Sequence, residues 1–397
     1  MPPRATQLAL PAAILLVACN LRPALAGIGP LLDPIQSATG LGDTGAGLLT
    51  TIPVALMGLC LLVSDSIRTR FGDCWGIAIG LGAIALACAL RWIAPEATAL
   101  LASAVLAGVG IAFVQALMPA IIRTYCTERS ARLMALYSTG IMGGAMIAST
   151  VSPPLAGLLN WPGALGVWLG PALAALAVWV AISRRFETSL VRRPRRAAAL
   201  HRSRRAWLLL LFFGLGTGAY TLVLAWLPPF YTRLGWSADA AGGLLGFVTL
   251  AEVIAGLGVS AWIDRLEDRR AALFAAIAAL LFGLLALIAA PLTLAWPAAL
   301  LLGLGIGALF ALSLIVAMDH ADNAALAGTI AGFVQGGGYL IAAVLPFAAG
   351  LLRAQLNDLT PAWLLMTGLC LALFLIAARF RPGDRIILPH YQTGEFR

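Results

Sequence analysis

The chain has 397 residues, of which 61% are hydrophobic and only 11% charged, and its mean hydropathy is +0.94. Soluble proteins carry about 45–50% apolar and about 25% charged residues. No segment has a soluble domain's composition, so these values exclude a chain of soluble domains and indicate a polytopic membrane protein. The formal net charge is +9, and all 26 basic residues are arginine.

Apolar runs of about 20 residues, bounded by charge, Pro or Gly, are typical of membrane helices. Twelve such runs occur. In chain order they are 8–32, 44–64, 75–94, 97–122, 133–159, 164–183, 207–231, 239–263, 271–290, 294–318, 326–350 and 360–380. The alternating pattern of a β-barrel strand is absent, so the sequence predicts an all-α protein with twelve spans.

The arginines predict the orientation of these spans. They fall in alternate connections: Arg68 and Arg70; Arg129 and Arg132; nine from Arg184 to Arg205; Arg265, Arg269 and Arg270; and four from Arg379 onward. The opposite connections hold only Arg91, Arg233 and Arg353. By the positive-inside rule we expect both termini in the cytoplasm. The 184–205 run is then a linker beside anionic lipid, and we expect no nucleic-acid partner.

The N-terminus imitates a lipoprotein signal peptide. Arg4 precedes an apolar run that ends near Leu16-Val17-Ala18-Cys19. A second apolar half-helix follows Cys19, where a processed lipoprotein would have a polar tether. We therefore expect this segment to remain as the first span.

The two halves of the sequence resemble each other. Gly108-Val109-Gly110-Ile111 matches Gly303-Leu304-Gly305-Ile306, and Pro153 with Gly157 matches Pro346 with Gly350. Two six-helix repeats with parallel topology are typical of the major facilitator fold, whose substrate site lies between the halves near the midplane. The sequence predicts an N-terminal half at 1–183, an Arg-rich linker at 184–206, and a C-terminal half with a short tail at 207–397. This fold can work as a monomer.

Two short connections between spans carry incomplete versions of the loop motif that is typical of this fold. Arg70-Phe71-Gly72 is present after span two, although Thr69 stands where an Asp is expected. After span eight, Asp264-Arg265 keeps the acid and the base. We expect Arg70, Asp264 and Arg265 to latch helices together in one conformation, or to be ordinary loop charges.

Three motifs sharpen the assignment. Asn20-Leu21-Arg22-Pro23, Ile28-Gly29-Pro30-Leu31-Leu32 and Gly47-Leu48-Leu49-Thr50-Thr51-Ile52-Pro53 resemble the cyanate transporter and 2-nitroimidazole transporter family, a branch of the major facilitators. The resemblance covers the whole chain in span pattern and is specific over 20–53. It implies a bacterial inner-membrane carrier of small anions or small nitrogenous compounds.

Arg22 is the main candidate for binding the substrate. A charge in the middle of a span is costly in lipid, so Arg22 should face a protein interior or a cavity. A guanidinium is always charged and holds a flat anion with parallel hydrogen bonds. The repeat places Thr217 opposite Arg22, so one cation near the midplane suits a monoanion. The alternative is a structural Arg22 paired with a buried acid or helix carbonyls.

Glu252, in the middle of span eight, is the candidate for proton coupling. Desolvation disfavours a charged carboxylate, so Glu252 could bind and release a proton as access alternates. It could instead be a counter-ion to Arg22 or have a structural role.

Other polar or aromatic side chains within spans are candidates for contacting the substrate, and helix packing is the alternative for each. They are Asn20, Gln115, Tyr137, Tyr220, Trp226, Gln335 and Tyr339. Trp226 could equally be an interface anchor.

Enzyme and pump functions lack their motifs. A phosphate-binding loop needs Lys, which is missing, and the His and Cys residues have no metal-ligand spacing. We expect no catalytic residue, cofactor or metal. The sequence predicts a secondary carrier for a small monoanion, cyanate being the leading substrate that the resemblance implies. Export of 2-nitroimidazole-like or other small neutral compounds, and a receptor that does not transport, are the alternatives.

Overall fold

The computed structural model describes residues 4–125, 130–184 and 197–386, and in these ranges all regular elements are helices. The first six spans are built from α1 (Arg4–Cys19) with α2 (Pro23–Ala26), η1 (Gly29–Leu31) and α3 (Leu32–Thr39), then α4 (Asp43–Leu62), α6 (Asp73–Ile93), α7 (Ala97–Tyr125), α8 (Ser130–Gly166) and α9 (Leu169–Ser183). The others are α10 (Arg204–Arg233), α11 (Ala238–Trp262), α12 (Arg270–Ala289), α13 (Ala295–Asp319), α14 (Ala324–Leu356) and α15 (Thr360–Ala377). Short elements between spans are α5 (Ser64–Phe71), η3 (Ala197–Arg202) and η4 (Ile263–Arg265).

Eleven stretches in the described residues are long and apolar enough to cross a membrane. One of them, 132–183, has 52 residues and contains two spans. Asn160 separates these with φ 59°, a left-handed conformation that an L-residue adopts mainly in turns. The prediction of an all-α protein with twelve spans is therefore confirmed.

Span one differs from the continuous helix predicted over 8–32. Helix α1 ends at Cys19, and after a short non-helical stretch the chain continues through α2, η1 and α3 to Thr39. Pro23 explains the break, because proline has no N–H to donate to the carbonyl of Cys19. Gly144 of α8 lies against that carbonyl, which a Cβ atom on Gly144 would approach to 2.2 Å.

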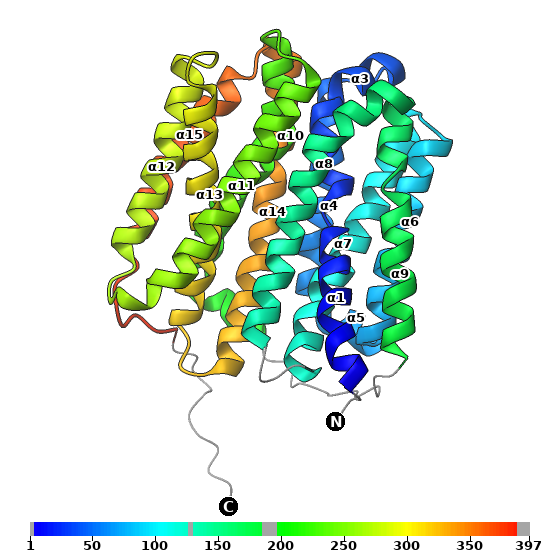
Figure 1. Ribbon diagram of the computed structural model, residues 1–397. Coiled ribbons are helices and arrows are strands. Elements are labelled where there is room, and N and C mark those ends of the chain that lie inside the picture. Colours follow the sequence, from blue (N-terminus) through cyan, green and yellow to red (C-terminus); the bar gives the residue numbers. More distant parts are fainter. Residues whose placement is uncertain (1–3, 126–129, 185–196, 387–397) are drawn as a thin grey trace, which may run out of the picture.

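The spans run roughly parallel to one another, and α1 begins on the same side of the molecule on which α15 ends (Figure 1). We call this side the termini side. The opposite side, which carries the turn between α3 and α4, is the far side. Helices up to α9 pack mainly among themselves, as do those from α10 onward. The two halves meet where α4 packs on α14, α8 on α11, and α10 on η1 and α2.

The contact between α8 and α11 is closer on the far side. There a Cβ atom on Gly242 would lie 2.3 Å from the carbonyl oxygen of Ser149. A Cβ atom on Gly246 would lie 2.4 Å from the methyl carbon of Thr150. Farther along α11, Gly256 has nothing within 4 Å of such an atom. The last turns of α11 are exposed nearly all round, at Ile254, Leu257, Ser260 and Trp262 among others. Helices α8 and α11 therefore pack tightly on the far side and separate toward the termini side, whereas α4 and α14 stay in close contact as far as Gly58 and Gly336.

Candidate functional site

Arg22 lies in the break of span one, as the N-cap residue of α2. Its side chain is only 4% exposed. The break turns this residue out of a continuous helix, so that a cation from the first half lies where the second half packs against it. A cation buried at this depth needs protein partners because lipid offers none.

Four partners of Arg22 come from four different helices. Its guanidinium lies over the ring of Tyr220 on α10, 5.3 Å from the ring centroid. Tyr339 on α14 interacts with the charge of this guanidinium. Tyr137 on α8 and Glu252 on α11 also interact with its charge. The sequence proposed all five residues as candidates, and the structure brings them together. We call this group the Arg22 cluster.

Glu252 is buried like Arg22, and Gly307 of α13 packs directly against its backbone. Among the described residues, no carboxylate forms an ion pair with the guanidinium of Arg22. Glu252 nevertheless interacts electrostatically with this cation. The Nε of Arg22 is buried and has no hydrogen-bond partner. The cluster thus holds a cation with an unused donor and an acid that does not neutralise it by direct contact.

The hydroxyl oxygens of two cluster residues, Tyr137 and Tyr220, are also buried without a partner, as is that of Thr217. The Oε1 of Gln115 on α7 is a further buried atom without a partner. Native proteins satisfy nearly all buried polar atoms, so several unsatisfied ones together indicate a place where a polar ligand completes the bonding. Thr217, which the repeat places opposite Arg22, is 3% exposed and lies on α10 one turn before Tyr220.

Three other candidates have different positions. The side-chain amide of Asn20 donates to the carbonyl of Leu16 at 2.8 Å, which secures the end of α1. Gln335 is half-buried on α14, one turn before Tyr339 and on the same face. Trp226 is fully buried toward the far side, where its indole N–H donates to the carbonyl of Pro346 at 2.9 Å.

Arg353 of α14 forms a contact between the two halves that the sequence did not suggest. Its guanidinium lies over the ring of Trp226, 3.5 Å from a carboxylate oxygen of Asp43 and 4.0 Å from one of Asp33. Thr232 of α10 donates to Asp33 as well. We call these five residues the far-side gate. Their only sequence signal is charge at span ends, which does not reveal partners.

The residues expected to latch helices together make little contact. Arg70 is exposed, with its guanidinium 5.8 Å from the ring centroid of the neighbouring Phe71. Arg265 is exposed, and the side chain of Asp264 lies outside the described residues. Arg269 joins helices instead. It donates to the carbonyls of Ile263 and Leu266 and pairs with Asp319 of α13 at 3.3 Å.

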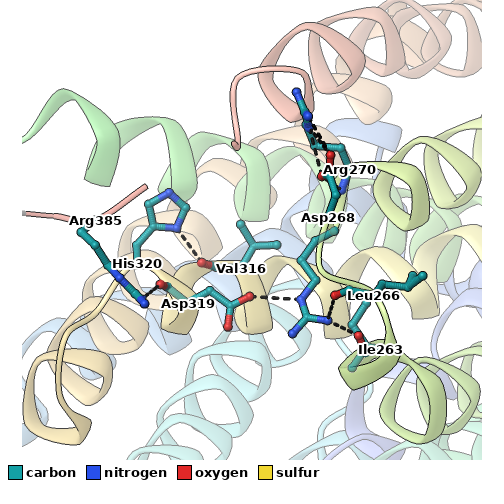
Figure 2. Close-up of polar contacts among 9 residues, drawn as sticks. Ile263, Leu266, Asp268, Arg270, Val316, Asp319, His320 and Arg385 are labelled. Carbon is teal, nitrogen blue, oxygen red and sulfur yellow. Dashed lines mark hydrogen bonds and ion pairs between the residues drawn. The ribbon is translucent and has the colours of Figure 1, made fainter. Parts of the chain in front are cut away.

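Figure 2 shows these contacts together with those of Arg385, which donates to the carbonyl of Asp319. His320 bonds the carbonyl of Val316 through Nδ1 at 2.7 Å. Burial lowers the pKa of His320 below its ordinary value. Burial opposes the ionisation of Asp384, but hydrogen bonds, chiefly from Arg205, hold the pKa of this carboxyl below its ordinary value. All these groups lie on α10 or on elements that follow it, on the termini side.

Arg91 corrects the sequence interpretation, which placed it in a connection between spans. It lies within α6, with its side chain 1% exposed inside the bundle. The predicted span ended near this residue, and sequence alone did not show that the arginine turns inward. As for metal ions, the described residues contain no group of three His, Cys, Asp or Glu side chains that could hold one.

Comparison with known proteins gives the family. The model of the Major Facilitator Superfamily matches residues 14–346. The chain belongs to this superfamily. It is 34% identical over 370 residues to the cyanate transport protein CynX of Escherichia coli strain K12, covering 93% of this chain and 96% of that protein. It is 31% identical over 367 residues to the 2-nitroimidazole transporter of the same organism, covering 90% of each. The resemblance predicted from residues 20–53 is thus confirmed.

Solved structures of other major facilitators share the fold. A D-xylose–proton symporter has a TM-score of 0.75 at 15% identity, over 96% of this chain and 99% of that one. A bacterial homologue of the human lysosomal transporter Spinster, in an inward-facing and occupied conformation, has a TM-score of 0.73 at 17% identity, over 96% of each chain. This chain is therefore a membrane-spanning transporter of the superfamily, with a small molecule as its substrate.

Proposed function

We propose that this protein carries a small monoanion by alternating access and that Arg22 recognises the charge of that anion. The observation that carries the proposal is a buried guanidinium with an unused donor, beside three tyrosines and an acid that makes no direct ion pair with it. An anion in this place gains charge-assisted hydrogen bonds from Arg22. The hydroxyl groups of Tyr137 and Tyr220 can donate to it from the other sides.

Cyanate is the first substrate to test. The cluster offers one cation, and Thr217 supplies no second charge from the other half, so a monoanion balances it better than a dianion. The relative named as a cyanate transport protein, 34% identical, supports the same choice. Cyanate is small, linear and singly charged, and it accepts hydrogen bonds at both ends.

Orientation follows from the arginines, and it is part of the proposal. By the positive-inside rule the termini side faces the cytoplasm of a bacterial inner membrane. The conformation described above, closed at the far-side gate and with α8 and α11 apart toward the termini side, is then the one that opens to the cytoplasm between these two helices. We further propose that 1–183 and 207–397 move as the two rocking bodies of a monomer, joined by the linker at 184–206.

Glu252 is proposed as the proton-binding group that couples transport to the proton gradient. It is buried in the second half and interacts electrostatically with Arg22 of the first half. A monoanion bound at Arg22 weakens the field of that cation, which favours the protonated carboxyl. Anion and proton would therefore bind together and leave together.

Counterflow in proteoliposomes tests Arg22. Vesicles loaded with unlabelled cyanate should take up labelled cyanate saturably with the wild type, and Arg22→Ala should lose this exchange. Arg68→Ala is the matched control, since Arg68 pairs with Asp73 on the termini side, away from the cluster. Equal exchange by wild type and Arg22→Ala would make Arg22 a structural residue and sink the proposal.

Glu252→Gln tests coupling separately. The variant keeps the size of the side chain but binds no proton in the physiological range. We expect it to retain cyanate exchange at equal pH and to lose accumulation driven by a pH gradient. Full gradient-driven accumulation in Glu252→Gln would exclude this residue as the proton site.

A second substrate class has its own support. Three tyrosines surround Arg22, and aromatic side chains pack well on a flat ring. A relative with 31% identity is named as a 2-nitroimidazole transporter. If 2-nitroimidazole is exchanged and cyanate is not, the protein handles small neutral heterocycles, and Arg22 then donates to the nitro group.

A further inference from the structure

Arg91 is a second arginine buried in the bundle, and the Arg22 cluster does not include it. Its Nη1 donates to the carbonyl oxygen of Ala24 at 2.7 Å, and its Nε donates to the hydroxyl of Ser103 at 2.8 Å. Ser103 in turn donates to the carbonyl of Leu100 at 2.6 Å, so its lone pairs are free to accept from Arg91. One side chain of α6 thus ties α7 to the middle of span one.

The bond to Ala24 replaces one that the break in span one removes. In a regular helix the N–H of Ile28 would donate to the carbonyl of Ala24. Here it donates to the carbonyl of Leu25 at 3.2 Å, which leaves the carbonyl of Ala24 without that donor. Within a membrane no water can bond an unpaired backbone group, so the missing donor has to come from the protein. Arg91 supplies it.

The same region of α6 also packs against the break. Ala24 forms a small buried cluster with Ala87 of α6 and Ala107 of α7. Ala87 lies one turn before Arg91, so both face the same neighbour. Short side chains let α2 approach closely, and the hydrogen bond from Arg91 then fixes its position along α6.

Stability alone does not account for a charge here. Among the described residues no carboxylate forms an ion pair with Arg91, and its Nη2 is buried without a partner. Replacing a buried charge by a well-packed apolar side chain is often neutral or stabilising. Arg91 does something an apolar side chain cannot do, which is to reach a carbonyl on another span and hold it in one place.

We propose that Arg91 is a positioning residue for the substrate site. It fixes α2, whose N-cap residue is Arg22, two residues before Ala24. With Ala24 held, the guanidinium of Arg22 keeps its place over Tyr220. The proposal rests on the proposed function only for its effect on substrate affinity, because the effect on the break is independent of any substrate.

Hydrogen exchange of the full-length protein tests the structural part without substrate. In Arg91→Met the amides of Leu25–Ile28 should exchange at least about tenfold faster than in the wild type, while α6 and α7 keep their protection. Arg68→Met is the matched control and should leave the break unchanged. Unchanged exchange at 25–28 would overturn the proposal. So would an equal loss of protection throughout α6 and α7, which would make Arg91 a general folding residue.

Cyanate counterflow tests the effect on the site. Arg91→Met should raise KM at least about tenfold with a smaller change in maximal rate, because displaced binding groups lose affinity. Arg91→Lys, which keeps a donor and the charge, should recover part of the loss. In an Arg22→Lys background, Arg91→Met should add little, since residues that act through one another are not additive.

The outcomes separate the two proposals. If the wild type exchanges no cyanate, the proposed substrate fails, and the hydrogen-exchange result alone decides the role of Arg91. If the wild type exchanges cyanate and Arg91→Met has the same KM, Arg91 does not position the site. Full additivity with Arg22→Lys would likewise contradict a role exerted through Arg22.

Discussion

The two ends of this transporter use their ion pairs differently. On the far side, Arg353 of the second half pairs with Asp33 and Asp43 of the first. On the termini side, the described ion pairs stay within one half. They are Arg68–Asp73, Arg205–Asp384, Arg269–Asp319, Arg270–Asp268 and Arg385–Asp322. One end joins the halves, and the other braces each half internally.

This difference matches what alternating access requires. Rocking between two states has to break the contacts that join the halves at the closed end, while each half moves as a rigid body. Ion pairs within a half survive such a movement, and those across the halves do not. If the halves rock as proposed, the far-side gate is the contact that opens, and the termini-side pairs keep their partners throughout the cycle.

The largest effect should come from filling the closed end. A Cβ atom on Gly350 would lie 2.6 Å from the carbonyl oxygen of Asp43. Overpacking of this kind costs about 1–3 kcal/mol, and here the cost falls only on the state with the gate closed. Gly350→Val should therefore reduce cyanate exchange by about fivefold to a hundredfold. Gly368→Val on α15, where a Cβ atom meets nothing within 4 Å, should have little effect. Equal losses in both variants would contradict the assignment of a gate.

Removing the charge of the gate should have a smaller effect. Arg353→Gln loses both carboxylate partners, which are partly exposed to solvent, so we expect a cost of about 1 kcal/mol to the closed gate. That is about a fivefold shift toward the state open at the far side. Pulsed EPR distances between labels at the far-side ends of α4 and α14 would measure it. An unchanged distance distribution would show that packing alone closes this end.

Breaking a brace on the termini side should lower stability without shifting the two states. Arg269→Gln removes the contacts that tie η4 to the end of α13 through Asp319. We expect a melting temperature lower by a few degrees, for a loss of about 1 kcal/mol. The EPR distances across the far side should stay as in the wild type. A shift in those distances would show that this pair takes part in gating.

The smallest effect concerns pH. His320 lies close to Arg205, Asp384 and Asp319, and its pKa in the folded protein is lowered, first by burial. The unfolded chain then binds more protons at this residue, so stability falls as the pH drops below about 6.5, the ordinary value for histidine. His320→Asn should flatten this decline in thermal melts between pH 7.5 and 5.5. An identical pH dependence in the variant would assign the decline to other groups.

Hydropathy was enough to predict most spans. Span nine was predicted at 271–290, and α12 runs from Arg270 to Ala289. The position of a span follows from the length and hydropathy of its own apolar run, which can be read locally in the sequence. Span one was the exception. Pro23 signalled a bend, but nothing in the local sequence showed that a distant side chain, Arg91, donates to the carbonyl of Ala24 in the break.

Contacts between residues that lie far apart in the sequence could not be predicted. Arg91 and Arg353 were assigned to connections because span ends cannot be located to within a turn from hydropathy. The members of the Arg22 cluster were named one by one, yet nothing in the sequence placed Tyr220 in the cluster and Trp226 in the gate. Six residues separate these two on α10, which is about 9 Å along a helix and a different face. That distance divides a binding site from a gate.

Equilibrium binding of labelled cyanate to the purified protein tests the central claim most directly, because it separates recognition by Arg22 from every step of turnover. The account predicts saturable binding by the wild type, retention of binding in Glu252→Gln at neutral pH, and loss of at least about tenfold in affinity in Arg22→Gln. The same dissociation constant in the wild type and in Arg22→Gln, with both proteins folded, would contradict it.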